Sequence, residues 1–290
     1  MTSSLRTEAP SRDDLRASFD ALIRARGTPL VIAHRGTTLG SFPDNTLRSA
    51  TGAVLSGADV VEIDVIASSD GEYFLFHTGY EKRHFGEDFD VRTLSSAELA
   101  AKRFVWQGGP EKPGVEKLAD LLHGLPHTWF NIDRSWGLWP GLLDELARLG
   151  VADRVLLKSP PKPEALAALA KHPVPFLYFP IVRTPEELEQ VEAFEGLHLI
   201  GAELLASTPA DAFADPATIA EVAARYPLIL LNALNLENGA RLYLDKSDET
   251  SLMVAPEAGW GRLVEAGATA IHTDWPHVVR QFLREQMLRT

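Results

Sequence analysis

Two acidic residues stand inside a strongly apolar segment. Glu62 and Asp64 lie two positions apart in VVEIDVI, residues 60–66. If this segment is a β-strand, both side chains project from the same face, because side chains alternate along a strand. The flanking valine and isoleucine residues predict a buried strand, so the two carboxylates would face the interior together. An exposed strand edge is the alternative explanation for such a pair.

A third carboxylate follows the next apolar run, because Asp133 ends TWFNID, residues 128–133. Converging carboxylates repel one another by about 4 kcal/mol per pair at 4 Å and an effective dielectric constant near 20. A divalent cation removes this repulsion, and three carboxylates with water suit Mg²⁺ or Ca²⁺. We therefore expect Glu62, Asp64 and Asp133 to bind one such cation. Zinc is less favoured, because the chain has no cysteine.

Histidines end two further apolar runs. His34 ends PLVIAH, residues 29–34, and His77 ends EYFLFH, residues 72–77. Either histidine alone would more often be structural, but two beside a metal could serve as general acid and base, because imidazole titrates near neutral pH. The neighbouring Arg35 offers a fork of donors for two phosphoryl oxygens. The strand ends are therefore predicted to surround a phosphate.

The elements that must position these residues alternate regularly. Apolar runs alternate with amphipathic segments, several of which begin with Thr-Pro-Glu-Glu or Asp-Pro and end in glycine, as helices do. This is the pattern of repeated βα units, and it predicts an α/β fold, a closed (β/α)₈ TIM barrel in one domain, 29–290. A doubly wound open sheet is the alternative. The eight runs are 29–34, 60–66, 128–133, 154–159, 175–182, 198–205, 228–234 and 270–274.

Two additions to the barrel are predicted. Within an N-terminal extension, residues 1–28, apolar residues at helical spacing over 12–26 predict an extra helix that covers the bottom of the barrel. A membrane-surface helix is the alternative, but the polar face carries both charge signs. The SSDG turn predicts a hairpin that adds residues 72–77 to the second strand, and the polar, aromatic residues 78–93 read as an insertion or lid loop.

Composition restricts the partners and the compartment. The net charge of −12 disfavours nucleic acid and anionic membranes as general partners. The absence of cysteine excludes disulfides and thiolate metal sites. No run of about 18 apolar residues occurs, which predicts no membrane span, and the N-terminal segment lacks the apolar core of a signal peptide, which favours the cytoplasm.

Several motifs resemble the glycerophosphodiester phosphodiesterase family. They are AHRG (33–36), PDNT (43–46), VEIDV (61–65), DGEYFLFH (70–77) and the closing HTDWP (272–276). The resemblance implies a (β/α)₈ barrel with a small insertion after the second strand, and metal-dependent hydrolysis of a small-molecule phosphodiester to an alcohol and a phosphomonoester. In the family, a neighbouring substrate hydroxyl often makes the first attack.

The resemblance also implies roles for individual residues. Glu62, Asp64 and Asp133 would hold Mg²⁺ or Ca²⁺, His34 and His77 would be the acid/base pair, and Arg35 would steady the phosphoryl oxygens.

Several positions depart from the family's pattern. Asp44 replaces the glutamate of Pro-Glu-Asn-Thr, and Thr78 follows the second histidine where aspartate is usual. The third-strand Glu-x-Lys is replaced by DRS, so the metal ligand Asp133 is shortened and a phosphate-binding lysine is missing. Lys158, at the end of the next strand, could reach the same phosphate. These changes keep acidic and basic side chains in the site but alter the length of the side chains and the position of the lysine. They therefore predict a divergent substrate.

Further residues are candidates for the substrate pocket. Trp136, Trp139 and Trp275 could stack on a sugar or cover a lipid-like or choline-type alcohol, with core or lid packing as the alternative for each. Asp44 and Glu203 are polar candidates for the same pocket.

Two other functions fit the same residues. One is a non-catalytic barrel that binds a phosphodiester or phosphosugar, which the altered DRS and PDNT motifs would explain. The other is metal-free cleavage by the two histidines and Arg35, as in bacterial phosphoinositide phospholipases.

Overall fold

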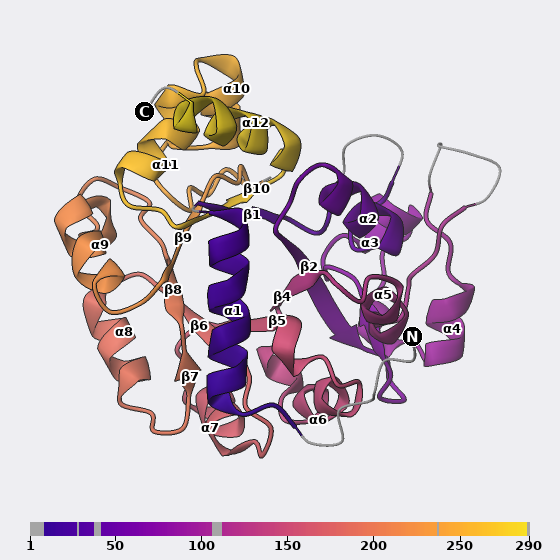
Figure 1. The fold of residues 1–290 in the computed structure, drawn as a ribbon. Helices are drawn as coiled ribbons and strands as arrows, with labels where there is room; N and C mark the ends of the chain where they lie inside the picture. Colours follow the sequence, from indigo (N-terminus) through magenta and orange to yellow (C-terminus); the bar gives the residue numbers. More distant parts are fainter. Residues whose placement is uncertain (1–8, 28, 38–41, 106–111, 237, 289–290) are drawn as a thin grey trace, which may run out of the picture.

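Eight parallel strands close into a barrel in this computed structural model, which describes residues 9–27, 29–37, 42–105, 112–236 and 238–288 (Figure 1). The hydrogen-bonded order is β1-β10-β9-β8-β6-β5-β4-β2, and β2 also pairs with β1, which closes the ring. The TIM barrel is therefore confirmed, and the open sheet is excluded. The barrel strands are β1 (Leu30–Ala33), β2 (Val60–Ala67), β4 (Trp129–Asp133), β5 (Val155–Ser159), β6 (Leu177–Val182), β8 (Gly201–Leu204), β9 (Leu228–Asn232) and β10 (Ala270–Thr273).

Helices surround the barrel, as Figure 1 shows. Their first turns are capped as the sequence predicts: Thr184 and Asp215 accept backbone N–H bonds from Glu187 and Ala217. The outer helices are α2 (Leu47–Leu55), α5 (Leu118–Gly124), α6 (Gly141–Arg148), α7 (Pro163–Lys171), α8 (Pro185–Glu192), α9 (Pro216–Ala223), α10 (Asp248–Met253), α11 (Arg262–Glu265) and α12 (Pro276–Met287). Short 3₁₀ or π turns lie at Val91–Thr93, Trp136–Leu138, Ala152–Arg154, Ala212–Ala214 and Glu257–Gly261.

The extra N-terminal helix is present as α1 (Arg12–Arg26). Its apolar face is buried, and the ring of Phe19 packs edge-on against Trp129 at the start of β4, with 5.8 Å between centroids. Because β4 begins at the bottom of the barrel, α1 covers that end, as predicted. Residues 1–8 and Thr28 of the predicted extension lie outside the described residues.

The segment after β2 is a packed unit. The hairpin strand β3 (Tyr73–Leu75) pairs antiparallel with β2, as the SSDG turn predicts. Residues 78–93 are not a structureless loop, because they contain α3 (Glu81–Phe85), and α4 (Ser96–Ala101) follows. Apolar side chains from the end of β2, from β3 and from the residues that follow form a separate small core beside the barrel, made of Ile66, Phe74, Phe76, Phe85, Val91, Leu99, Phe104 and Val115.

Two smaller findings complete the fold. β7 (His198–Leu199) is a two-residue strand paired with β6 just before β8. None of the described helices combines the length and the apolar character that crossing a membrane requires.

Candidate active site

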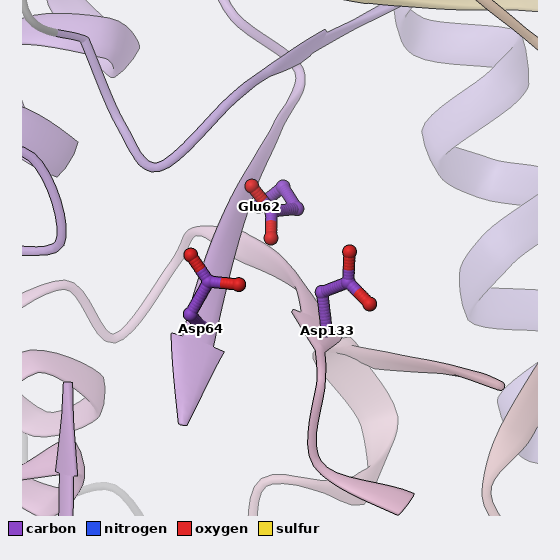
Figure 2. Close-up of side chains that lie close together, drawn as sticks. All are labelled: Glu62, Asp64 and Asp133. Atoms are coloured by element: carbon purple, nitrogen blue, oxygen red, sulfur yellow. The ribbon is translucent and has the colours of Figure 1, made fainter. Parts of the chain in front are cut away.

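Three carboxylates converge at the carboxyl ends of β2 and β4. Asp64 and Asp133 are register partners on these adjacent strands, and Glu62 lies two residues before Asp64 on the same face. One oxygen of each side chain lies within 4.8 Å of the others, and Figure 2 shows the three side chains close together at the ends of β2 and β4. We refer to Glu62, Asp64 and Asp133 as the carboxylate cluster. Its predicted convergence is confirmed.

Burial makes the carboxylate cluster electrostatically unfavourable on its own. Glu62 and Asp64 are 1% and 2% exposed. Burial and then the charge of Glu62 raise the pKa of Asp64 to about 6, and burial also raises the pKa of Glu62. Glu62 and Asp64 therefore resist carrying a negative charge, whereas the charge and hydrogen bond of Lys158 outweigh burial and lower the pKa of Asp133. A bound cation would relieve that repulsion.

Basic groups already orient the three carboxylates. The backbone N–H of Arg35 donates to Oε2 of Glu62 (2.8 Å), and its Nε forms an ion pair with Oδ2 of Asp64 (3.3 Å). The ammonium of Lys158 lies 2.9 Å from Oδ2 of Asp133. These contacts engage one oxygen of Glu62 and one of Asp64, so the second oxygen of each can serve as a ligand. The donor set of hard oxygens fits Mg²⁺ or Ca²⁺.

His34 follows β1 and is held by a carboxylate from the other end of the chain. Its Nδ1 lies 2.8 Å from Oδ1 of Asp274, just beyond β10. Burial alone would lower the pKa of His34, but the hydrogen bond and charge of Asp274 outweigh it and raise that pKa above its ordinary value. Asp274 is fixed in turn, because its backbone N–H donates to buried Asp248. The other ring nitrogen of His34 is left for a ligand.

His77 follows β3 and lines the same pocket as His34. Burial lowers the pKa of His77, against the opposing charge of Asp64. Its ring packs edge-on against Tyr80, with 4.6 Å between centroids. The two imidazoles are therefore shifted in opposite directions, which favours a proton on His34 and a neutral ring on His77.

The PDNT turn builds the backbone next to the carboxylate cluster. Asn45 adopts a left-handed conformation (φ 54°), which asparagine tolerates better than most residues. Its side chain donates to Oδ2 of Asp64 (3.0 Å) and accepts from the backbone N–H of Asp64 (2.8 Å). Asn45 was missed by sequence reasoning. Its place in a turn beside the metal-binding strand was the available signal.

Asp44 positions Arg35 instead of facing the main pocket. Its Oδ2 lies 3.3 Å from Nη1 of Arg35, and its Oδ1 lies 2.9 Å from Nε2 of His84 on α3. Burial would raise the pKa of Asp44, but the His84 and Arg35 contacts lower it to about 2. Tyr80 stacks on the Arg35 guanidinium, 4.6 Å from its ring centroid. The inserted segment thus holds the phosphate-binding candidate in place.

A chain of polar contacts runs around the rest of the barrel mouth. Lys158 is 1% exposed and also pairs with Oε2 of Glu203 (3.0 Å), so it is a buried, ion-paired lysine and not a solvated one. Nδ2 of Asn232 donates to Oε1 of Glu203 (2.8 Å). Oδ1 of Asn232 lies 3.0 Å from Nδ1 of His272, whose Nε2 is 3.6 Å from Oε2 of Glu62. Sequence reasoning missed His272, because it lies within an apolar strand.

These residues line a pocket of about 200 Å³. Its polar side carries His34, Arg35, Asp64, His77, Asp133, Arg134, Lys158, Glu203, Asn232 and His272. Its apolar side carries Ile181, Leu205, Leu234, Leu236 and Leu242, which we call the apolar wall.

The predicted tryptophans lie in different surroundings. Trp136 lines the pocket as predicted. Trp275 does not line it, because this residue packs against a core cluster on the far side of β10. Trp139 is a core residue, 8% exposed, that packs against Tyr178.

Comparisons with known proteins agree with this architecture. The sequence profile of the glycerophosphoryl diester phosphodiesterase family matches residues 34–159. A glycerophosphodiester phosphodiesterase of Bacillus altitudinis is 25% identical over 140 residues, which are 44% of this chain and 57% of that protein. The chain thus spans little more than half the length of the curated relatives it matches.

Solved structures share the whole fold. A glycerophosphoryl diester phosphodiesterase from Parabacteroides distasonis superposes with a TM-score of 0.75 at 17% identity, over 96% of this chain and 93% of that one. A phosphodiesterase from Oleispira antarctica, solved in complex with the product sn-glycerol-3-phosphate, has a TM-score of 0.66 at 20% identity, over 92% and 99% of the two chains.

Proposed function

We propose that the chain is a distant member of the glycerophosphodiester phosphodiesterase family and that it hydrolyses a small phosphodiester with the help of one divalent cation. The observation that carries this proposal is the convergence of three carboxylates within 4.8 Å, in a pocket that His34 and His77 also line. Such a group of charges is unfavourable without a cation and useful with one.

The carboxylate cluster would hold Mg²⁺ or Ca²⁺. When bound, the cation supplies positive charge to the phosphoryl oxygens as negative charge builds on them. Arg35 adds donors beside the same oxygens, and its guanidinium is kept in one orientation by Asp44 and the Tyr80 ring. Lys158 contributes a further fixed positive charge, held between Asp133 and Glu203.

The two histidines divide the proton transfers. His77, whose pKa is lowered by burial, takes the proton from the attacking hydroxyl of the substrate or of water. The new P–O bond forms as the ester P–O bond to the leaving alcohol breaks. His34, whose pKa Asp274 raises, gives its proton to the leaving alkoxide oxygen. Environments that push two pKa values apart are the usual way in which one site provides both an acid and a base.

A panel of phosphodiesters with and without divalent cations tests this function. Glycerophosphocholine, a lysophospholipid, a sugar phosphodiester and bis(p-nitrophenyl) phosphate would each be assayed with EDTA, Mg²⁺ or Ca²⁺. We expect turnover of at least one substrate, its loss in EDTA and its recovery with the cation. Full activity in chelator would refute the metal requirement and favour metal-free cleavage by the histidines.

The non-catalytic alternative gives a distinct result in the same panel. A binding protein would be stabilised against heat by a phosphodiester without forming any product. Product formed by the wild type and lost in His77→Ala would exclude it.

A further inference from the structure

Asp248 is a buried carboxylate that the proposed reaction does not use. It opens α10, is 3% exposed and is not among the residues that line the pocket of the carboxylate cluster. Burial raises the pKa of Asp248 to about 7, so its ionised form opposes folding, a cost that is complete above about pH 7. Stability therefore does not explain this residue.

Three donors converge on the carboxylate of Asp248. The indole Nε1–H of Trp260 and the hydroxyl of Thr273 both donate to Oδ1 (2.7 Å each). The backbone N–H of Asp274 donates to Oδ2 (2.9 Å). Indole and backbone N–H groups can only donate, so both oxygens must accept. A carboxylate meets this requirement, whereas an amide would turn its NH₂ group toward one of those N–H groups.

Asp274 depends on these contacts because the sheet ends one residue earlier. The β1–β10 register ends at Thr273, whose carbonyl accepts from the backbone N–H of His34 (3.0 Å). The backbone N–H of Asp274 is held by Asp248 instead. The hydroxyl of Thr273, which donates to Asp248, accepts from the N–H of Trp275 (2.9 Å). One carboxylate thus fixes the backbone on both sides of the Asp274 side chain.

We propose that Asp248 is a positioning residue for the proposed acid, and that it acts by fixing Asp274 against Nδ1 of His34. The inference rests on the proposed function for the role of His34 as an acid. Oδ1 of Asp274 lies 2.8 Å from that nitrogen, and a hydrogen bond weakens as its distance and angle depart from their optimum. A shift of the Asp274 backbone would therefore weaken the contact that stabilises the protonated ring.

Other groups act on His34 by separate routes. Burial lowers the pKa of His34, and the hydrogen bond and charge of Asp274 raise it. The charge of Glu62 also raises that pKa, and the charge of Arg35 lowers it. The ring of His272 packs edge-on against His34, with 5.1 Å between centroids. Only the contribution of Asp274 runs through the proposed positioning residue.

Nuclear magnetic resonance of the substrate-free protein tests the assignment without any assay of activity. With ¹⁵N-labelled histidine, the signals of His34 are identified by their absence in His34→Gln, and their titration with pH gives the pKa. Asp274→Asn should lower the pKa of His34 furthest, and Asp248→Asn should lower it by less. A pKa in Asp248→Asn equal to that of the wild type would overturn the inference.

Ser251→Ala is the matched control for damage to α10. The hydroxyl of Ser251 accepts from the backbone N–H of Trp260 (2.9 Å) and donates to the carbonyl of Ser247 (2.8 Å). Among the described residues, it makes no hydrogen bond to Asp248. This variant should lower the melting temperature and leave the pKa of His34 unchanged. A fall of that pKa as large as in Asp248→Asn would assign the effect to general loss of structure and overturn the positioning role.

The rate gives a second readout. Asp248→Asn should lower kcat by about tenfold and Asp274→Asn by about 100-fold, with KM little changed, because both act on the proton transfer. The double variant should lose no more than Asp274→Asn alone, because the two residues act through one contact. Additive losses would overturn the inference.

Thr273→Val keeps the inference testable if Asp248→Asn does not fold. It removes one donor to Asp248 and the acceptor for the N–H of Trp275, and it leaves Asp274 in place. We expect the pKa of His34 to fall by less than in Asp274→Asn, and an unchanged pKa would overturn the positioning role.

The outcomes also distinguish this inference from the proposed function. A lowered pKa of His34 in Asp248→Asn, with no turnover of any phosphodiester by the wild type, would support the link from Asp248 to His34 and refute the hydrolysis. Turnover by the wild type, with the pKa of His34 unchanged in Asp248→Asn, would overturn the link and leave the hydrolysis standing.

Discussion

Strands β1, β2, β4 and β5 deliver most of the charged side chains to the pocket, whereas β6 and the segments that follow β8 and β9 deliver the apolar wall. Most of the charged side chains, from His34 to Lys158, lie within residues 34–159, which match the family profile, whereas Glu203, His272 and the apolar wall lie outside them. Both sides enclose the same space of about 200 Å³. If the proposed hydrolysis holds, we expect the first half of the barrel to carry the reaction and the second half to select the alcohol attached to the phosphate.

The sharpest way to break this comparison is to remove a metal ligand. Asp64→Asn should reduce kcat by about 10³-fold or more, because the carboxylate cluster loses a third of its charge. Burial and the charge of Glu62 raise the pKa of Asp64 to about 6, so the ionised group opposes folding. That penalty is absent below the unfolded pKa near 4 and is complete above about 6. The metal-free variant should therefore melt no lower than wild type at pH 7. A lower melting temperature would contradict this account of the cluster.

Removing the proposed base should give the next largest effect. His77→Ala should lower kcat by about 10²- to 10⁴-fold with little change in Mn²⁺ or Mg²⁺ affinity, because the role proposed for His77 is to move a proton and not to bind metal. Single-turnover kinetics and a metal titration would measure the two quantities. Comparable losses in both would place His77 among the ligands.

The stability of the fold gives a third test, through Asp44, a residue beside the charged side of the pocket. The His84 and Arg35 contacts lower the pKa of buried Asp44 to about 2, so its carboxylate stabilises the fold above the unfolded pKa near 4. That contribution is lost as the pH falls through about 2. Asp44→Asn should lower the free energy of unfolding by about 2 kcal/mol at pH 7, and by progressively less below pH 4. Urea unfolding at several pH values would show this, and a loss independent of pH would assign the effect to packing.

A substitution in the apolar wall should have the smallest effect on the catalytic rate and the clearest effect on substrate selectivity. Leu242→Asn should leave turnover of bis(p-nitrophenyl) phosphate within a few-fold of wild type. It should shift the ratio of kcat/KM between a lysophospholipid and glycerophosphocholine by about tenfold toward the polar alcohol. Leu252→Asn on α10 is the control, because Leu252 is 40% exposed and does not line this pocket. An unchanged ratio of the two kcat/KM values would contradict a role for the second half of the barrel in substrate selection.

The features that could be predicted from the sequence are those that depend on local spacing. Glu62 and Asp64 share a face because strands alternate, and eight apolar runs are enough to predict the barrel. Asp133 joins them because β4 pairs with β2 in a register that sets it beside Asp64.

The features that sequence reasoning missed depend on the closure of the barrel or on segments too short to show a periodic pattern. The partners of Lys158 come from β4 and β8, so its ion pairs become visible only when the ring of strands is complete. His272 is hidden in an apolar run and gains meaning from Asn232 on the neighbouring strand. The five residues of α3 are too few to show a helical period. Trp275 follows a strand end but turns outward, because it starts α12.

The seam where β1 pairs with β10 has a consequence for synthesis of the chain. His34 emerges from the ribosome about 240 residues before Asp274, the carboxylate that supports its charge. Until the final strand docks, the nascent chain has one imidazole without its partner and a barrel still open at that edge. Hydrolytic competence is therefore expected to appear late and all at once, when the two ends of the polypeptide meet.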